Sequence, residues 1–380
     1  MGFLTLKIDQ NRVFGLDILR AIAILFVIIE HGTVLLPKEI LAVSELFIFD
    51  GVSIFFVLSG FLIGGILLKI FEENQEINFK LVKDFWIRRW FRTLPNYYLV
   101  LFLLTVLNYF FVNDFQLWKV KRYIFFAQNL NNAHPKFFGE AWSLSVEEWF
   151  YLIIPLLIVF FLKIFKIKSK EAIITVAVLT LLSITLFRYI KHLNIEVLRY
   201  KDWDLLFRKQ VFTRLDSIMY GVIGAYIHFY YITNWTRFKK IFLGIGVIMF
   251  LFAKYYSPYI NGAYFKVFYF SFISLATLFT LPFLSTLTTG KGLFYKPITY
   301  ISLISYSMYL LNLSVIQLWI LDKIDWTVIT GNIYLISGVK YFMYWFLVIT
   351  LSILLYKYFE IPMMKLRDKK ALNFLKYKLG

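Results

Sequence analysis

The segment VFGLDILRAIAILFVIIEHG, residues 13–32, is long and apolar, and it identifies the class of protein. A helix needs about 20 mostly apolar residues to cross the ~30 Å hydrocarbon core of a membrane, and this stretch provides them. It also contains Asp17, Arg20, Glu30 and His31, although ionisable side chains are costly inside a membrane. The stretch therefore predicts a membrane-spanning helix that carries functional groups. It is too long for the apolar part of a signal peptide and contains an arginine, so we expect it to be retained.

The whole chain is unusually apolar for its size. Its 380 residues are 60% hydrophobic and only 17% charged, whereas an average soluble protein is about 25% charged. This composition excludes disordered proteins, nucleic-acid-binding modules and ordinary cytosolic enzymes. The net charge of +18 is then explained by basic loops at the cytoplasmic ends of helices, with no nucleic acid as partner.

Nine further apolar stretches follow the first. Continuous apolar runs of this length favour helices over the alternating strands of a membrane barrel. The sequence thus predicts an all-α, polytopic integral membrane protein with about ten transmembrane helices. We expect a single membrane domain over 1–380, with core spans at about 13–358, a basic cytoplasmic tail at 359–380 and no appended domain. The ten spans lie near 13–36, 51–71, 94–113, 146–165, 172–190, 213–232, 241–254, 263–284, 298–321 and 334–358.

The distribution of basic residues predicts the orientation of these spans. With the N-terminus inside, the inner ends carry 24 Lys and Arg residues and the outer ends 16, when Arg20 within the first span is left out. Cytoplasmic loops carry the excess of Lys and Arg in membrane proteins. We therefore expect both termini in the cytoplasm and a location in the cell's inner, cytoplasmic membrane.

Arg20 and His31 are the strongest functional candidates within a span. Eleven residues are about three helical turns, so the two side chains lie on nearly one face, about 16 Å apart along the axis. Arg20 is then in the inner half of the membrane and His31 near its outer end. The alternative is that Asp17 merely neutralises Arg20 at spacing i,i+3 and that His31 is an interfacial residue.

Arg88, Arg89 and Arg92 form a basic cluster in FWIRRWFRTLPNYY, directly before the third predicted span. Such a cluster fits two roles equally well on composition. It anchors the topology and contacts anionic lipid headgroups, or it binds phosphate groups through the planar guanidinium forks.

Two further polar sets lie at the outer mouths of spans. The first set lies at the start of the fourth span and consists of Trp142, Ser143, Glu147 and Glu148. The spacing from Ser to Glu in this set is also typical of a helix N-terminal cap. At the start of the sixth span stand Arg214 and Asp216. Small residues at spacing i,i+4, namely Gly60 with Gly64 and Gly221 with Ala225, predict close helix packing.

Several motifs are missing from the sequence. It has no cysteine, no phosphate-binding P-loop, no dinucleotide-binding glycine fingerprint, no Gly-x-Ser-x-Gly elbow and no metal-ligand spacing. We therefore expect no bound metal and no bound cofactor.

The polar motifs taken together resemble the acyltransferase 3 family, whose members O-acetylate bacterial surface glycans. The resemblance covers the whole chain, and its motifs occur in family order. Three positions differ from the usual pattern, because Ser53 stands where Asp is common, Asn312 where His is common, and Glu30 before His31 is less usual. The motifs are Arg20 with His31, DGVSIFFVLSGFLIGG at 50–65, RRWFRTLP at 88–95, WSLSVEEWFYL at 142–152, RLDSIMYG at 214–221, ISYSMYLLN at 304–312 and YFEIP at 358–362.

The resemblance implies ten helices, essential roles for Arg20 and His31, a cytoplasmic acyl-CoA donor, normally acetyl-CoA, and an acceptor hydroxyl at the outer face. The acceptor is then a carbohydrate or glycolipid, and the other partner is the lipid bilayer. On this reading His31 is the general base, and Glu147 or Glu148, at the same outer depth, orients the imidazole or binds the sugar. Donor binding is assigned to Arg88, Arg89 and Arg92 together with Arg20, and acceptor binding to Trp142, Ser143, Arg214 and Asp216.

One competing class fits many of the same observations. A transporter or flippase for a polar lipid-linked substrate also places charges along a path through the membrane. Transporters often consist of two related halves, and the first-span motif has no second copy in this sequence. The sequence therefore favours an enzyme.

Overall fold

The computed structural model describes residues 6, 8, 12–74, 79–256, 259–328 and 331–367. These residues form helices joined by short connections, and no strand occurs among them. Residues 368–380 of the predicted basic tail lie outside the described residues. The α-helices are α1 Phe14–Gly32, α2 Lys38–Glu45, α3 Gly51–Glu73, α4 Phe79–Phe111, α5 Lys121–Ile124, α6 Ala141–Ile164, α7 Ser169–Asn194, α8 Tyr200–Trp203, α9 Leu215–Tyr230, α10 Ile232–Arg237, α11 Lys239–Tyr255, α12 Tyr269–Leu284, α13 Tyr295–Leu311 and α14 Ile333–Leu355.

Several of these helices continue into short segments of different pitch. A π-helix has wider turns than an α-helix and is found mostly where function requires a distorted helix. The segment η7, Asn312–Ile320, is π-helical and extends α13, and η10, Tyr356–Glu360, extends α14 in the same way. Two more π-helical segments are η4, Asp204–Arg208, and η6, Tyr264–Phe268.

The all-α, multi-pass membrane class is confirmed. Eight helical segments of the described residues are long and apolar enough to cross a membrane. The sixth and seventh predicted spans correspond to α9 and α11, which have 16 and 17 residues and so fall short of that length. The eight segments are Phe14–Leu35, Gly51–Glu73, Phe79–Phe111, Ala141–Ile164, Ser169–Asn194, Tyr264–Leu284, Tyr295–Lys323 and Ile333–Arg367.

Two predicted span boundaries were wrong, and both errors affect the site. The third span was expected to begin near residue 94, but α4 begins at Phe79 and continues through Pro95, so the arginine cluster lies within the helix. The fourth was expected to begin near residue 146, but α6 begins at Ala141 without a side-chain cap. Glu147 and Glu148 consequently lie in the second turn of α6, and the capping interpretation does not hold.

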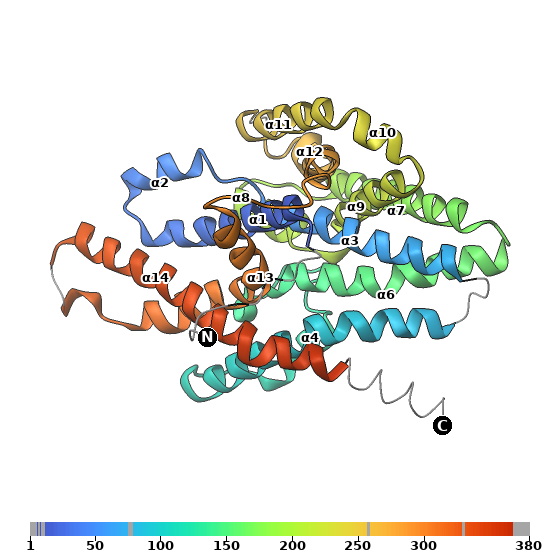
Figure 1. Ribbon diagram of the computed structural model, residues 1–380. Helices are drawn as coiled ribbons and strands as arrows, with labels where there is room; N and C mark the ends of the chain where they lie inside the picture. Colours follow the sequence, from blue (N-terminus) through green and yellow to red (C-terminus); the bar gives the residue numbers. More distant parts are fainter. Residues whose placement is uncertain are drawn as a thin grey trace, which may run out of the picture.

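The helices surround a central group formed by α1, α3 and α13 (Figure 1). In Figure 1, α11 and α12 lie along one edge of the molecule, whereas α4 and α14 lie along the opposite edge. The helices α3 and α9 pack closely, because a side chain at Gly60 would meet the carbonyl of Ile218 and one at Gly221 would meet that of Val57. The predicted small-residue contact is therefore confirmed.

The outer surfaces of the peripheral helices are apolar. Phe102 and Phe110 on α4 are 67% and 71% exposed, and Phe342 on α14 is 68% exposed. Large exposed apolar surfaces of this kind mark contact with lipid in a membrane protein.

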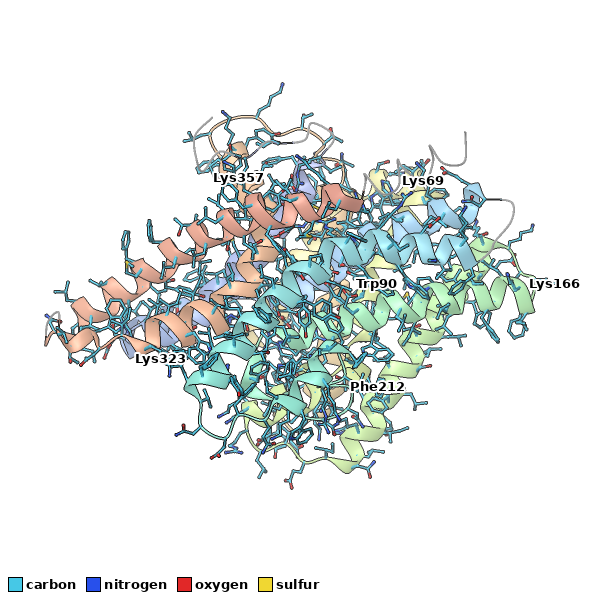
Figure 2. The ribbon with its side chains drawn as sticks, turned by 90° about the horizontal axis from the view of Figure 1, so that it is seen from below. Lys69, Trp90, Lys166, Phe212, Lys323 and Lys357 are labelled. Carbon is cyan, nitrogen blue, oxygen red and sulfur yellow. The ribbon has the colours of Figure 1, made fainter. Side chains whose placement is uncertain are left out.

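Two connections that are expected on the cytoplasmic side lie at the same end of the molecule. Figure 2 shows Lys69, near the end of α3, and Lys166, between α6 and α7, at the same end, with Lys323 at the other. The positions of these three lysines are those that the expected alternation of spans requires.

Candidate active site

Arg20 and His31 lie on one uninterrupted helix, α1, and both face the parallel neighbour α13 with its extension η7. Arg20 donates a hydrogen bond to Ser302 of α13 at 3.4 Å. Eleven residues further along, His31 Nδ1 lies 2.5 Å from Asn312 Oδ1. The prediction that both side chains share one helix face is confirmed.

The charge of Asp17 is shared among several groups. Its carboxylate is bonded to Arg12 and accepts a 2.7 Å hydrogen bond from Ser302, whereas Arg20 Nη1 lies 3.7 Å away. Asp17 therefore does not hold Arg20 in an exclusive pair. This leaves donor groups of Arg20 directed toward the space beside α1.

That space is a cavity of about 130 Å³, which we call the arginine cavity. Its polar wall combines Arg20 with Arg89 and Arg92 of α4, and Arg92 is also exposed, so the cavity opens to the surface there. Guanidinium groups from two helices bind phosphate oxygens well. The remaining lining residues are Val52, Phe55, Phe56, Leu58, Ser59, Leu62, Thr93, Ser143, Leu144, Glu147, Tyr151, Ser305, Tyr306 and Tyr309.

Arg88 does not share this position. It stands one residue before Arg89 on α4, and consecutive side chains of a helix point about 100° apart. Arg88 is exposed and lies outside the lining of the arginine cavity in the described residues. The structure therefore brings only two of the three clustered arginines, Arg89 and Arg92, to the arginine cavity.

Glu147 and Glu148 lie beside the arginines, whereas His31 contacts η7. Glu147 lines the arginine cavity and accepts a 2.9 Å hydrogen bond from Tyr151, whose ring is 5.0 Å from the Arg89 guanidinium. Glu148 accepts a 2.8 Å hydrogen bond from Thr93 of α4. The expectation that either carboxylate orients the His31 imidazole is wrong, since α6 begins a turn and a half earlier than expected.

Asn312 performs the orientation instead. Its Nδ2 donates to the carbonyls of Met308 at 3.0 Å and Tyr309 at 2.7 Å, which leaves Oδ1 as the acceptor toward His31. The hydrogen bond at His31 Nδ1 must then be donated by the imidazole. In a neutral ring the proton therefore sits on Nδ1, and Nε2 keeps its lone pair, as a general base requires.

Glu140 holds the helix segment that carries Asn312, a role that no pattern in the sequence indicates. It is 1% exposed. Its carboxylate accepts hydrogen bonds from the backbone N–H groups of Leu313 at 3.1 Å and Ser314 at 2.7 Å, and from the Ser314 hydroxyl. These bonds satisfy amide groups at the start of the π-helix η7 and fix Asn312 relative to α1.

The buried position of Glu140 predicts a pH-dependent stability. Glu140 lies just before the span that begins at Ala141, and burial raises its pKa to about 7, although the bonds from Ser314 and Leu313 favour the charged form. A folded-state pKa above the unfolded value stabilises the fold at low pH, and this stabilisation is lost as pH rises through about 7. The loss amounts to roughly 3 kcal/mol at most.

We expect thermal unfolding in detergent to show this dependence. Between pH 5.5 and pH 8.5 the wild type should lose more stability than Glu140→Gln, whose amide does not titrate. Equal pH dependence of the two proteins would show that Glu140 does not titrate in this range.

Trp142 and Arg214 do not form an open acceptor surface. Trp142 is 4% exposed, and its ring is approached by the guanidinium groups of Arg208 at 5.5 Å and Arg214 at 5.8 Å. Arg214 is fully buried, bonds to Ser53 at 2.6 Å and lies 4.1 Å from the centre of the Phe270 ring. The assignment of Trp142 and Arg214 to acceptor binding is thus corrected, because both side chains are buried against other groups of the protein.

Ser143 and Asp216 are likewise engaged within the protein. Ser143 shares a 2.6 Å hydrogen bond with Tyr309 and lines the arginine cavity. Asp216 forms a fully buried ion pair with Arg188 of α7, with oxygen–nitrogen distances of 2.6 and 3.0 Å. The assignment of Asp216 to acceptor binding is corrected to a structural link between α7 and α9.

A second cavity, of about 450 Å³, lies near the end of α1 that carries His31. We call it the Glu30 cavity. Glu30 and Thr33 of α1 contribute to its wall, together with Asp50 and Arg208. Arg208 and Lys209 are close enough to interact electrostatically with His31. The other lining residues are Ile48, Phe49, Tyr200, Trp203, Ala253, Lys254, Tyr256, Phe265, Tyr269 and Ile273.

Comparison with known proteins agrees with this arrangement. The family described as "Acyltransferase domain", acyltransferase 3, matches residues 13–357. The chain belongs to the acyltransferase 3 family. The relatives that the chain matches are named O-acetyltransferases. Membership of this family favours an enzyme over the transporter or flippase alternative.

Two relatives illustrate the extent of the similarity. The O-acetyltransferase OatA of Staphylococcus aureus is 28% identical over 399 residues, which cover 96% of this acyltransferase and 59% of that protein. The peptidoglycan O-acetyltransferase OatA of Listeria monocytogenes is 33% identical over 173 residues, which cover 42% and 26% of the two chains. The acyltransferase spans about three fifths of the length of the relatives that match most of it. No solved structure matches it.

Proposed function

We propose that this acyltransferase moves an acetyl group from acetyl-CoA, or another acyl-CoA, to a hydroxyl of a surface or lipid-linked carbohydrate. The observation that carries the proposal is the arrangement of α1. One end of the helix contributes Arg20 to a cavity with three arginines, and the other presents an imidazole whose Nε2 is left as a base. The phosphates of CoA suit the first site, and the long pantetheine arm allows the thioester to approach the second.

The chemistry follows from these positions. His31 Nε2 takes the proton of the acceptor hydroxyl as its oxygen attacks the thioester carbonyl, and a new C–O bond forms. The C–S bond then breaks, and the CoA thiolate receives the proton to give free CoA and an acetyl ester. Asn312 keeps the imidazole in the required tautomer, since its Oδ1 accepts from Nδ1.

The location and orientation are part of the same proposal. The protein lies in the cell's inner, cytoplasmic membrane with both termini in the cytoplasm, so that Arg20 and the arginine cavity face the cytoplasmic donor. The basic connections support this orientation. The carbohydrate class of the acceptor is supported by the Listeria relative, which is named a peptidoglycan O-acetyltransferase.

Transfer of radiolabel by the purified protein tests the proposal. Wild-type protein in lipid nanodiscs is supplied with [14C]acetyl-CoA and a mixture of oligosaccharides prepared from bacterial cell envelopes. The expected result is alkali-labile radiolabel on the carbohydrate, with CoA released in equal amount. Carbohydrate that stays unlabelled under all donor conditions would contradict the proposal.

The arginine cavity predicts unequal effects for two neighbouring arginines. Arg89→Gln should weaken acetyl-CoA binding about tenfold or more, because a charge-assisted phosphate contact contributes roughly 1.5–3 kcal/mol. Arg88→Gln is the matched control, since it removes the same charge one residue away from an exposed position. Equilibrium dialysis with radiolabelled acetyl-CoA measures both affinities.

The two variants separate donor binding from a topological role. Equal weakening by both substitutions would point to a general electrostatic effect of the basic cluster. Unchanged acetyl-CoA affinity in Arg89→Gln would show that the basic cluster does not bind the donor, and it would support the role of the cluster in membrane anchoring.

A further inference from the structure

The Glu30 cavity is lined by two kinds of side chain. Its wall is aromatic, with Tyr269 and Phe265 beside the more open rings of Tyr200 and Tyr256, which are 58% and 47% exposed. Its charged groups gather around Arg208. Small-molecule sites typically combine apolar walls with a few convergent polar groups in this way, and the volume of about 450 Å³ is in their usual range.

The cations of the cavity are already engaged by the protein itself. The Arg208 guanidinium lies 3.1 Å from Asp204, 3.4 Å from Asp50 and 3.9 Å from Glu30. Lys254 donates a 2.9 Å hydrogen bond to the carbonyl of Ile48. An acidic ligand entering the cavity would therefore meet an arginine that already faces three carboxylates, two of which, Glu30 and Asp50, line the cavity itself.

Asp50 is held as a fixed carboxylate. Burial works against its charge, but Arg208 and Arg214 outweigh this effect and lower the pKa of Asp50. Its oxygens accept hydrogen bonds from the backbone N–H of Ser53 at 3.1 Å and from the Ser53 hydroxyl at 2.7 Å. Asp50 thus serves as the N-terminal cap of α3 and has little capacity left for a ligand.

Glu30 differs from Asp50 in this respect. Its side chain is 36% exposed, and its distance to Arg208 of 3.9 Å is longer than a hydrogen bond. Glu30 also directly precedes His31 on α1. A carboxylate with spare acceptor capacity, beside the residue assigned as the base, fits a hydroxyl-bearing ligand.

We propose that the Glu30 cavity binds the acceptor as an uncharged carbohydrate, with Glu30 accepting hydrogen bonds from its hydroxyl groups and the rings of Tyr200 and Tyr256 contacting its apolar faces. The inference deepens the proposed function and rests on it for the identity of the ligand as acceptor. It replaces Trp142 and Asp216 as the acceptor surface. It also gives the unusual glutamate before His31 a role in selecting neutral over acidic sugars.

Binding of two tetrasaccharides tests the inference without requiring turnover. Radiolabelled chitotetraose, which is neutral, and tetragalacturonate, which carries four carboxylates, are measured by equilibrium dialysis against wild-type protein in nanodiscs. We expect the wild type to bind chitotetraose at least tenfold more tightly. Glu30→Gln should weaken chitotetraose binding about tenfold and so reduce the difference in affinity between chitotetraose and tetragalacturonate. Tyr200→Ala should weaken the binding of both sugars.

Glu39→Gln is the matched control, because it removes a carboxylate from α2, outside the Glu30 cavity, and should leave chitotetraose affinity unchanged. Chitotetraose binding that is absent in the wild type, or unaffected by Glu30→Gln, would overturn the inference. The proposed function is judged separately by acetyl transfer. Sugar binding that depends on Glu30 but is not followed by acetyl transfer would refute the proposed reaction and support the sugar-binding role of the Glu30 cavity. Acetyl transfer that does not depend on Glu30 would support the reaction and refute that role.

Discussion

His31→Gln should reduce acetyl transfer by a factor of about 10² to 10⁴, the usual contribution of a positioned general base. The glutamine side chain retains an amide that can bond Asn312 Oδ1, so the contact between α1 and η7 is preserved. It has no basic nitrogen corresponding to Nε2 and cannot take the acceptor proton. Initial rates with [14C]acetyl-CoA in nanodiscs measure the loss, and acetyl-CoA binding should be unchanged.

His228→Gln provides the matched control. His228 lies on α9 and packs against the rings of Phe61 and Trp235, with centroid distances of 5.7 Å to each. It lines neither the arginine cavity nor the Glu30 cavity, so its substitution should leave the rate nearly unchanged. Full acetylation by His31→Gln would return His31 to the role of an interfacial residue.

The second large effect is expected at Asp216 and concerns stability. Removing one partner of a buried ion pair leaves the other charge uncompensated, which typically costs about 3–5 kcal/mol. Asp216→Asn leaves the fully buried Arg188 without its carboxylate partner and should lower the thermal unfolding temperature markedly. Asp202→Asn, which breaks the exposed ion pair with Arg199, should change it very little.

A double substitution distinguishes a structural role from acceptor binding. Replacing both charges, as Arg188→Met with Asp216→Leu, removes the stranded cation and should recover much of the lost stability. Chitotetraose binding should recover with it. Normal unfolding of Asp216→Asn together with lost sugar binding would instead restore Asp216 to the acceptor site.

The features that could be predicted from the sequence are those determined locally. A run of apolar residues specifies a membrane helix, and the spacing of Arg20 and His31 on such a helix fixes their relative position whatever surrounds them. The close packing at Gly60 and Gly221 was predictable for the same reason, because small residues one turn apart allow two helices to approach.

The errors arose where a helix continues through polar residues. Hydropathy marked the ends of the third and fourth spans at their polar stretches, but α4 and α6 extend beyond them. This shift moved Glu147 from the neighbourhood of His31 to that of Arg89. Span limits drawn from hydropathy alone therefore misplace side chains that enter the membrane as buried polar groups.

Other parts of the site depend on contacts between distant segments. Glu140 and Ser314 are separated by 174 residues, and their hydrogen bonds fix the π-helix that carries Asn312. The Glu30 cavity joins α1 to residues near positions 200 and 265. No local sequence pattern indicates contacts between such distant residues, and a single sequence contains no covariation that would reveal them.

Transfer across a sealed membrane shows whether donor and acceptor reach opposite ends of α1. The protein is reconstituted into proteoliposomes in one orientation, with the acceptor oligosaccharides trapped inside and [14C]acetyl-CoA added outside, on the side of the arginine cavity. We predict that radiolabel appears on the trapped carbohydrate and that His31→Gln prevents it. Labelling that occurs only when donor and acceptor are on the same side of the membrane would contradict binding of the two substrates at opposite ends of α1.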